Sequence, residues 1–185
     1  NIAWVKSFTP STYGSLVNKH SETNSIDVLP ATLIRIGERA FENADSIEHI
    51  LLAGIEQIDD YAFHSADKLC CVEVTNTTTS LGIYIFADCD SIVEFEFYDG
   101  MTYIPEGTFY DADSLVDVTI PQTVTVVETS AFEEADSITT IELSNATTTI
   151  EDFAFRSSGI TDIVIPATVT NVGLEVFAHC HQLAN

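Results

Sequence analysis

Apolar and polar positions follow one another in a fixed order that repeats along most of the chain. The clearest unit begins at Leu115, where the alternating residues 118–120 predict a half-buried strand. A second apolar pair at 126–127 and an Ala-Phe step ending at Phe132 follow, and Ile138 begins the next unit. The pattern therefore predicts consecutive copies of one structural unit.

Phenylalanine marks the period of this repeat. Seven Phe residues recur at intervals of 22 or 23 residues, namely Phe41, Phe63, Phe86, Phe109, Phe132, Phe155 and Phe177. Apolar strand positions recur with them, at Ile50, Val72, Phe95, Val118, Ile141 and Ile163, and two residues further on in each unit. A fixed period of this length indicates a solenoid, in which each turn buries its apolar face against the next. We expect parallel strands, little α-helix and one row of seven buried Phe side chains.

The repeated unit resembles the BspA-type leucine-rich repeat. Residues 160–183, ITDIVIPATVTNVGLEVFAHCHQL, follow that pattern closely, and the resemblance covers residues 25–185. It implies a β-rich, right-handed solenoid of seven turns with a parallel sheet on one face. It also implies a non-catalytic protein, secreted or at the cell surface, that acts in adhesion. No catalytic residue and no cofactor are implied.

Composition restricts the possible partners. The chain has 185 residues, enough for one domain, and 29 acidic residues against six basic ones, which gives a formal net charge of −23. Nucleic acids and anionic membranes are therefore poor partners, and no apolar run is long enough to span a bilayer. Residues 1–24 lie outside the repeat and hold the single Trp, so we expect an N-terminal cap there. We expect the C-terminal end to be uncapped or truncated.

The outward positions of the predicted strands vary from unit to unit, as expected of a recognition face. We take as the candidate binding face Glu73, Glu94, Glu96, Asp117, Thr119, Glu142 and Asp162. Six of these seven side chains are carboxylates, which favours a cation or a basic ligand. The alternative is a solvated face whose like charges discourage aggregation.

A second acidic column lies four residues after Phe in five units, at Asp45, Asp67, Asp90, Asp113 and Asp136. Aspartate at such a position accepts backbone N–H groups in turns, so we expect these carboxylates to cap the turns. Calcium between turns is the alternative, although the spacing matches no known calcium motif.

The four cysteines do not form a recognised metal pattern. Cys89 and Cys180 occupy a column of small residues, so we expect buried free thiols there. Cys70 or Cys71 reaches Cys89 only if the turn folds back, which the sequence leaves open. His179 and His181 flank Cys180 but are a weak metal signal, and we predict no metal site.

Two Asn-x-Thr sequons begin at Asn76 and Asn145, at the same position of units three turns apart. In a secreted eukaryotic protein we expect both to carry N-glycans on one edge of the coil. The alternative is coincidence in a chain rich in threonine.

Two functions remain. The first is a surface or secreted module that presents its sheet face to a protein or a glycan. The second is a structural subunit that stacks head to tail into a filament, because four of the six basic residues precede Phe41 while 26 of the 29 acidic residues follow Arg39. Such a contact does not close on itself and therefore propagates.

Overall fold

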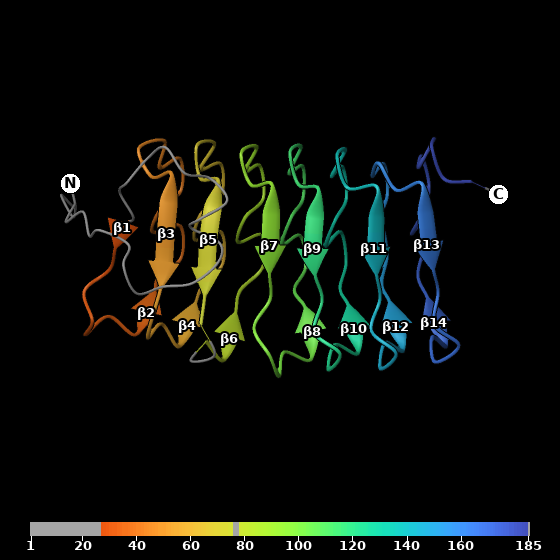
Figure 1. Cartoon of the computed structure of the whole chain (residues 1–185), viewed down its shortest axis with the longest axis horizontal. Helices are drawn as coiled ribbons and strands as arrows, with labels where there is room; N and C mark the ends of the chain where they lie inside the picture. The colour runs from red at the N-terminus through yellow and green to blue at the C-terminus, as the bar shows by residue number, and fades with distance from the viewer. Residues whose placement is uncertain (1–26, 76–77, 185) are drawn as a thin grey trace.

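The computed structural model describes residues 27–75 and 78–184. Within these ranges the chain is a parallel β-solenoid with no helix (Figure 1). The predicted N-terminal cap at residues 1–24 lies outside the described residues. Strands of successive turns lie side by side along the long axis of the molecule, as the repeat predicts.

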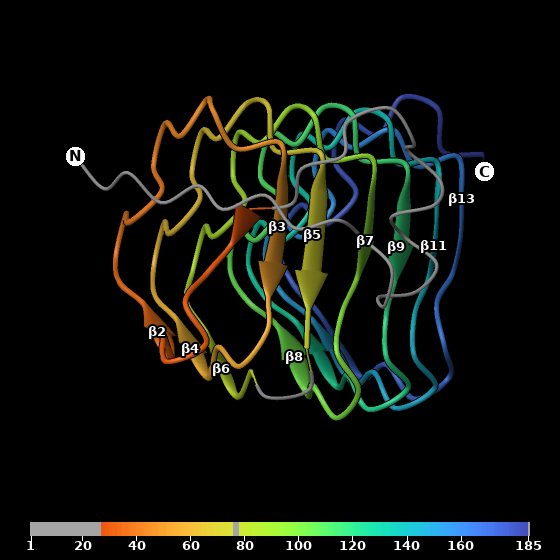
Figure 2. The same cartoon turned by 60° about the vertical axis from the view of Figure 1, so that its left-hand side comes forward.

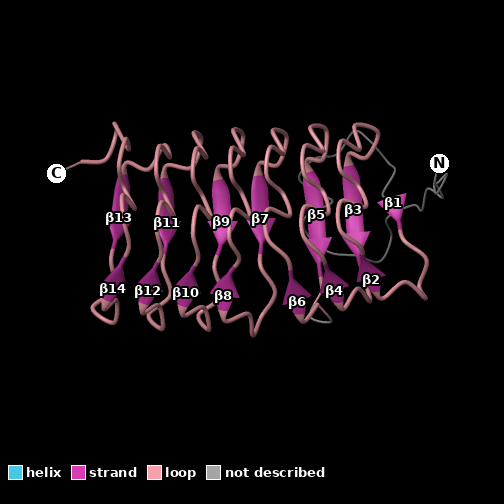
Figure 3. Ribbon diagram, turned by 180° about the vertical axis from the view of Figure 1, so that it is seen from behind, coloured by secondary structure: helices cyan, strands magenta, loops and turns pink. Residues whose placement is uncertain are grey.

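The strands form two rows (Figures 1 and 3): the odd row lies where the sequence predicted parallel strands on one face, and the even row is a second set that the sequence did not predict. The odd row consists of β1 (Asp27–Val28), β3 (His49–Leu52), β5 (Cys71–Val74), β7 (Glu94–Glu96), β9 (Asp117–Thr119), β11 (Thr140–Glu142) and β13 (Asp162–Val164). The even row consists of β2 (Arg35–Ile36), β4 (Gln57–Ile58), β6 (Ser80–Leu81), β8 (Tyr103–Ile104), β10 (Val126–Val127), β12 (Thr149–Ile150) and β14 (Asn171–Val172). Each even strand has only two residues, too few to produce a period-two signal in the sequence.

The pairing register equals the sequence repeat. Ile50 of β3 lies opposite Val72 of β5, and Phe95 of β7 lies opposite Val118 of β9. In the even row, Val127 of β10 lies between Ile104 of β8 and Ile150 of β12. Because the register preserves the period, equivalent side chains of successive turns stack directly on one another.

The core is organised around the Phe column. Stacked rings run from Phe41 to Phe177, with centroids of neighbouring rings 5.1–5.8 Å apart. The five inner rings are fully buried, as predicted, whereas Phe41 and Phe177 are half-buried. The prediction of seven buried rings is therefore wrong at the two ends, where each ring has a stacked Phe on one side only.

A left-handed backbone surrounds each Phe. The residues two before and two after every Phe of the column have positive φ, and only one of these fourteen residues, Gly107, is glycine. Between them, the Phe N–H donates to a carbonyl of the next turn, as Phe132 does to Ala154. Left-handed conformations cost about 1–2 kcal/mol per residue. We infer that the hydrogen bonds and ring stacking between turns offset that cost.

The prediction that the aspartate column caps these turns is wrong. In the described part of the chain no hydrogen bond involves the carboxylates of Asp45, Asp67, Asp90, Asp113 or Asp136. Backbone hydrogen bonds hold the turns instead, both between turns and within them. The carboxylates lie exposed at the bends, where successive turns place them in a row.

Candidate functional site: the outward face of the odd row

The seven predicted face residues all lie on β5, β7, β9, β11 and β13, and alternation turns them away from the core. Register brings several of them together: Glu94 lies opposite Asp117, and Glu96 lies opposite Thr119. Five of the seven are exposed, whereas Glu73 and Glu94 are half-buried. We name this set of side chains the odd-row face; the strands that carry it lie along one side of the coil (Figure 2).

Within the described chain, four carboxylates of this face, Glu96, Asp117, Glu142 and Asp162, make no ion pair. The described arginines pair elsewhere: Arg35 with Asp59, Arg39 with Glu42, and Arg156 with Glu133. Partial burial raises the pKa of Glu73 above its ordinary value. Like charges on adjacent strands repel one another, so a cationic partner would relieve unfavourable energy already present in the sheet.

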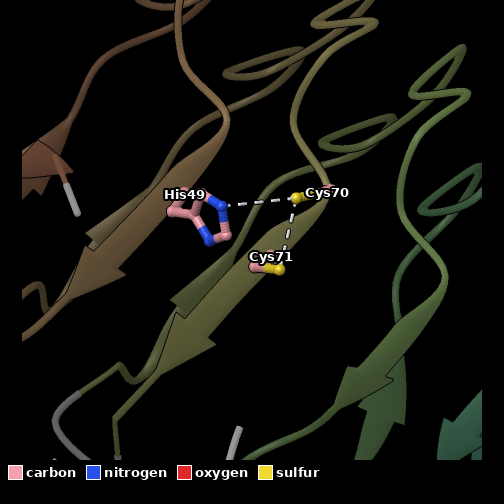
Figure 4. A group of neighbouring side chains, drawn as sticks. All are labelled: His49, Cys70 and Cys71. Carbon is pink, nitrogen blue, oxygen red and sulfur yellow. Dashed lines mark hydrogen bonds between the residues drawn. The ribbon is translucent and has the colours of Figure 1, made fainter. Parts of the chain in front are cut away.

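Toward the N-terminal end of this row, an imidazole and two thiols take the place of the carboxylates: His49, Cys70 and Cys71 lie close together (Figure 4). His49 lies opposite Cys71 in the β3–β5 register, and Cys70 directly precedes β5. The Sγ atoms of Cys70 and Cys71 are 3.3 Å apart, and the Cys70 Sγ lies 3.8 Å from His49 Nε2. Figure 4 shows the two sulfurs and the imidazole gathered on one side of the sheet.

The two thiols titrate as a pair. The hydrogen bond from the Cys71 thiol lowers the pKa of Cys70 to about 7. The same bond, together with burial and the charges of Glu94 and Glu73, raises the pKa of Cys71. Near neutral pH the pair therefore loses its first proton from Cys70, and the Cys71 thiol stabilises the resulting thiolate by its hydrogen bond.

The other two cysteines face the core, as predicted. The Cys89 thiol donates to the Phe63 carbonyl and the Cys180 thiol to the Phe155 carbonyl. Both are free thiols, so neither Cys70 nor Cys71 reaches Cys89. The rings of His179 and His181 lie 6.1 Å apart while the Cys180 thiol points inward, so these three residues form no common site.

A groove of about 350 Å³ opens on the even row, where pairing stops between β6 and β8. Equivalent residues of other turns donate a backbone N–H to the preceding turn, as Gly82 does to Ile58 and Glu128 does to Ile104. The residue at this position after β8 is Pro105, which has no N–H and therefore interrupts the ladder.

Sequence reasoning missed this groove, although a proline in that column was its signal. The lining includes the carboxylates of Asp59, Asp60 and Glu128. Each already accepts a hydrogen bond: Asp59 from Arg35, Asp60 from the N–H of Ile83, and Glu128 from the N–H of Glu106. These carboxylates already bind groups of neighbouring turns and are not available to a ligand. The odd-row face is therefore the stronger candidate for a binding site.

Comparison with known proteins decides the family. The model of the BspA type leucine rich repeat region matches six copies, over residues 16–99 and 56–184. The chain belongs to this family. BspA-type repeats are typically scaffolds for protein interactions rather than enzymes, and no protein of curated function matches this chain in sequence.

Solved structures share the fold of this BspA-type chain. A leucine-rich repeat protein of T. pallidum is 23% identical with a TM-score of 0.81, and the match covers 86% of this chain and 78% of that one. One from Eubacterium ventriosum is 19% identical with a TM-score of 0.77, covering 86% and 44%. A leucine rich cell surface protein from Faecalibacterium prausnitzii is 24% identical with a TM-score of 0.61, covering 91% and 40%.

This BspA-type chain therefore spans less than half the length of the Eubacterium and Faecalibacterium proteins. In its described part, no helix has the length and apolarity needed to cross a membrane.

Proposed function

We propose that this BspA-type solenoid is a binding module of a secreted or cell-surface protein, and that its odd-row face receives a basic protein partner. The observation that carries the proposal is a row of exposed carboxylates that make no ion pair in the described chain: Glu96 of β7, Asp117 of β9, Glu142 of β11 and Asp162 of β13. The cell-surface description of the Faecalibacterium protein supports the location. The role is adhesion without catalysis, and the bound surface is rich in Lys and Arg.

The test compares two variants of equal net charge. The face variant carries Glu96→Gln, Asp117→Asn, Glu142→Gln and Asp162→Asn. The control variant carries Asp67→Asn, Asp90→Asn, Asp113→Asn and Asp136→Asn, at exposed turn positions whose side-chain carboxylates make no hydrogen bond within the described chain. Each variant loses four negative charges.

Binding is measured against a panel of immobilised basic and acidic proteins at several salt concentrations. We expect the intact chain to bind basic members of the panel, the face variant to lose that binding, and the control variant to retain it. Equal losses in both variants would show that overall charge, rather than the odd-row face, controls binding.

Head-to-tail stacking is the second candidate. At the last turn Val164 is 81% exposed, and Val172 and Leu174 are 52% and 59% exposed, so an apolar edge lies open at β13 and β14. A second copy would cover that edge, as would a further repeat. Electron microscopy of the intact chain at high concentration tests stacking: elongated particles that disappear when residues 1–24 are deleted support it, and single particles from the intact chain oppose it.

N-glycosylation of Asn145 and Asn76 is a further proposal, for a eukaryotic secretory source. Asn145 is exposed in the turn after β11, whereas Asn76 lies outside the described residues. The threonines of both sequons have a structural role, because the buried hydroxyls of Thr78 and Thr147 donate to carbonyls of the preceding turn. Intact mass of natively sourced protein before and after glycosidase treatment tests the proposal, and an unchanged mass refutes it.

A further inference from the structure

The N-terminal end of the odd-row face carries a donor set unlike the rest of that face. His49, Cys70 and Cys71 each offer one ligand atom, and the three atoms lie within 4.8 Å of one another. All three residues are half-buried, so solvent reaches the group while the sheet holds it in place. One imidazole and two thiolates form a borderline-soft set that is suited to Zn²⁺ and poorly suited to Ca²⁺ or Mg²⁺.

The fold builds this group in two ways. The β3–β5 register sets His49 beside Cys71 on adjacent strands. Cys70 lies just before β5 and outside the strand, so its side chain does not follow the alternation of the strand, and its sulfur lies 3.3 Å from that of Cys71. The backbone that carries the ligands is held independently of any metal, since the N–H groups of both Cys70 and Cys71 donate to the carbonyl of Glu48.

The present distances need only small changes to accept an ion. A tetrahedral zinc ion with Zn–S bonds of about 2.3 Å places two sulfur ligands about 3.8 Å apart, and a sulfur and a nitrogen about 3.6 Å apart. The observed separations are 3.3 Å for the two sulfurs and 3.8 Å between the Cys70 sulfur and His49 Nε2, and the Cys71 sulfur lies within 4.8 Å of the imidazole ligand atom. Rotation of the cysteine side chains supplies shifts of this size without moving the strands.

The charge around the group favours a cation. Glu73 lies two residues beyond Cys71 on the same strand, and Glu94 of β7 acts electrostatically on the Cys71 sulfur. Two thiolates beside these carboxylates would repel one another strongly, and a divalent ion removes that repulsion.

We propose that His49, Cys70 and Cys71 form a three-ligand Zn²⁺ site whose fourth position is open to water. Zinc there would link the turn that carries β3 to the turn that carries β5 and so stabilise the N-terminal part of the described coil. No such group recurs in the other described turns, because the positions equivalent to Cys71 carry carboxylates or threonine after β5. The site would bind one ion per chain.

The experiment uses the phosphine-reduced, metal-free chain and Zn²⁺ alone, titrated in competition with a chromophoric chelator. We expect one specific site per chain and a rise in the thermal midpoint on adding Zn²⁺. Co²⁺ is a spectroscopic probe of the same site, because thiolate-to-cobalt charge-transfer absorption reports sulfur ligation directly.

Three variants decide whether these residues are the ligands. His49→Ala and the double variant Cys70→Ser/Cys71→Ser should weaken Zn²⁺ binding by about 100-fold or more, and the double variant should abolish the cobalt–thiolate absorption. The control, Cys89→Ala, removes a buried thiol from the column that alanine fills in other turns, and should bind like the unmodified chain.

A second control addresses nonspecific binding to this acidic surface: Glu142→Gln/Asp162→Asn removes distant carboxylates of the same face and should leave the specific site unchanged. The proposal is overturned if the double serine variant binds Zn²⁺ as tightly as the unmodified chain. It is also overturned if reduced protein shows no site above nonspecific binding and no cobalt–thiolate absorption.

Discussion

Phe132 and Phe155 lie face to face in successive turns, with ring centroids 5.4 Å apart and parallel ring planes. This contact is the interaction that the 23-residue period repeats along the coil. Phe132 also stacks on Phe109 at 5.8 Å, so it has a ring on each side and no exposure to solvent.

Truncation of this ring tests the stacked core. Phe132→Ala should lower the free energy of unfolding by about 3–5 kcal/mol, because neighbouring turns cannot collapse into the hole without breaking their backbone hydrogen bonds. Phe41→Ala is the matched control, since Phe41 is half-buried and stacks on Phe63 alone. Urea denaturation should give a clearly smaller loss for the control, and equal losses would contradict the stacked arrangement.

Gly107 tests the left-handed turns. Its φ is +58°, and a Cβ added there would lie 2.3 Å from a ring carbon of Tyr84. Gly107→Ala should therefore cost more than the roughly 1–2 kcal/mol of the left-handed conformation alone. In a Tyr84→Ala background the added methyl no longer meets the ring, so the same substitution should cost less. A double-mutant cycle with no coupling would contradict this contact.

The Arg156–Glu133 ion pair should contribute more to the free energy of unfolding than the Arg35–Asp59 pair. Glu133 is only 6% exposed and is bonded by both Arg156 and Ser130. Arg156→Met leaves that carboxylate buried without its cation, whereas Arg35 is 61% exposed, so water replaces the lost cation at Asp59 more readily after Arg35→Met. Chemical denaturation should show a larger loss for Arg156→Met, and a larger loss for Arg35→Met would contradict the assignment.

Stability should fall as pH rises through the acidic range. Burial, followed by the charges of Asp113, Asp88 and Glu134, raises the pKa of Asp111 to about 6. Its pKa in the unfolded chain is about 3.9, so between these values the folded state holds more protons and loses stability as pH rises. Burial also raises the pKa values of Glu73, Asp90 and Glu128, whereas the hydrogen bond from Arg35 lowers that of Asp59.

Thermal unfolding at pH 5 and pH 7 measures this effect. The midpoint should be higher at pH 5, and the difference should shrink in Asp111→Asn, whose amide suits the left-handed backbone there (φ 52°). Added salt should also narrow the difference by screening the carboxylates. A midpoint that rises from pH 5 to pH 7 would contradict this prediction.

The sequence predicted those features that every turn repeats. The Phe column and the odd-row strands recur in each unit, so their burial and register follow from the period alone. The even-row strands were missed because two residues, such as Val126 and Val127, carry no alternation. The left-handed residues were missed because Tyr, Ser, Asp and Glu occupy positions where glycine would have been the signal.

The candidate sites also contain some residues whose positions the repeat predicts and others whose positions it does not predict. His49 and Cys71 are separated by one repeat of 22 residues, so the period is enough to predict that they lie opposite one another on adjacent strands. The third member of the group, Cys70, lies just before β5, where strand alternation gives no direction for its side chain. The groove at Pro105 arises where one turn departs from the others, and such a departure does not show in a repeated pattern.

The proposal that the odd-row face is the binding surface is tested most directly by hydrogen–deuterium exchange of the chain, free and bound to a basic partner from the panel. We predict added protection in β7, β9, β11 and β13 and none in the turns that carry Asp90, Asp113 and Asp136. Protection confined to those turns or to the even row, with the odd strands unchanged, would contradict the proposal.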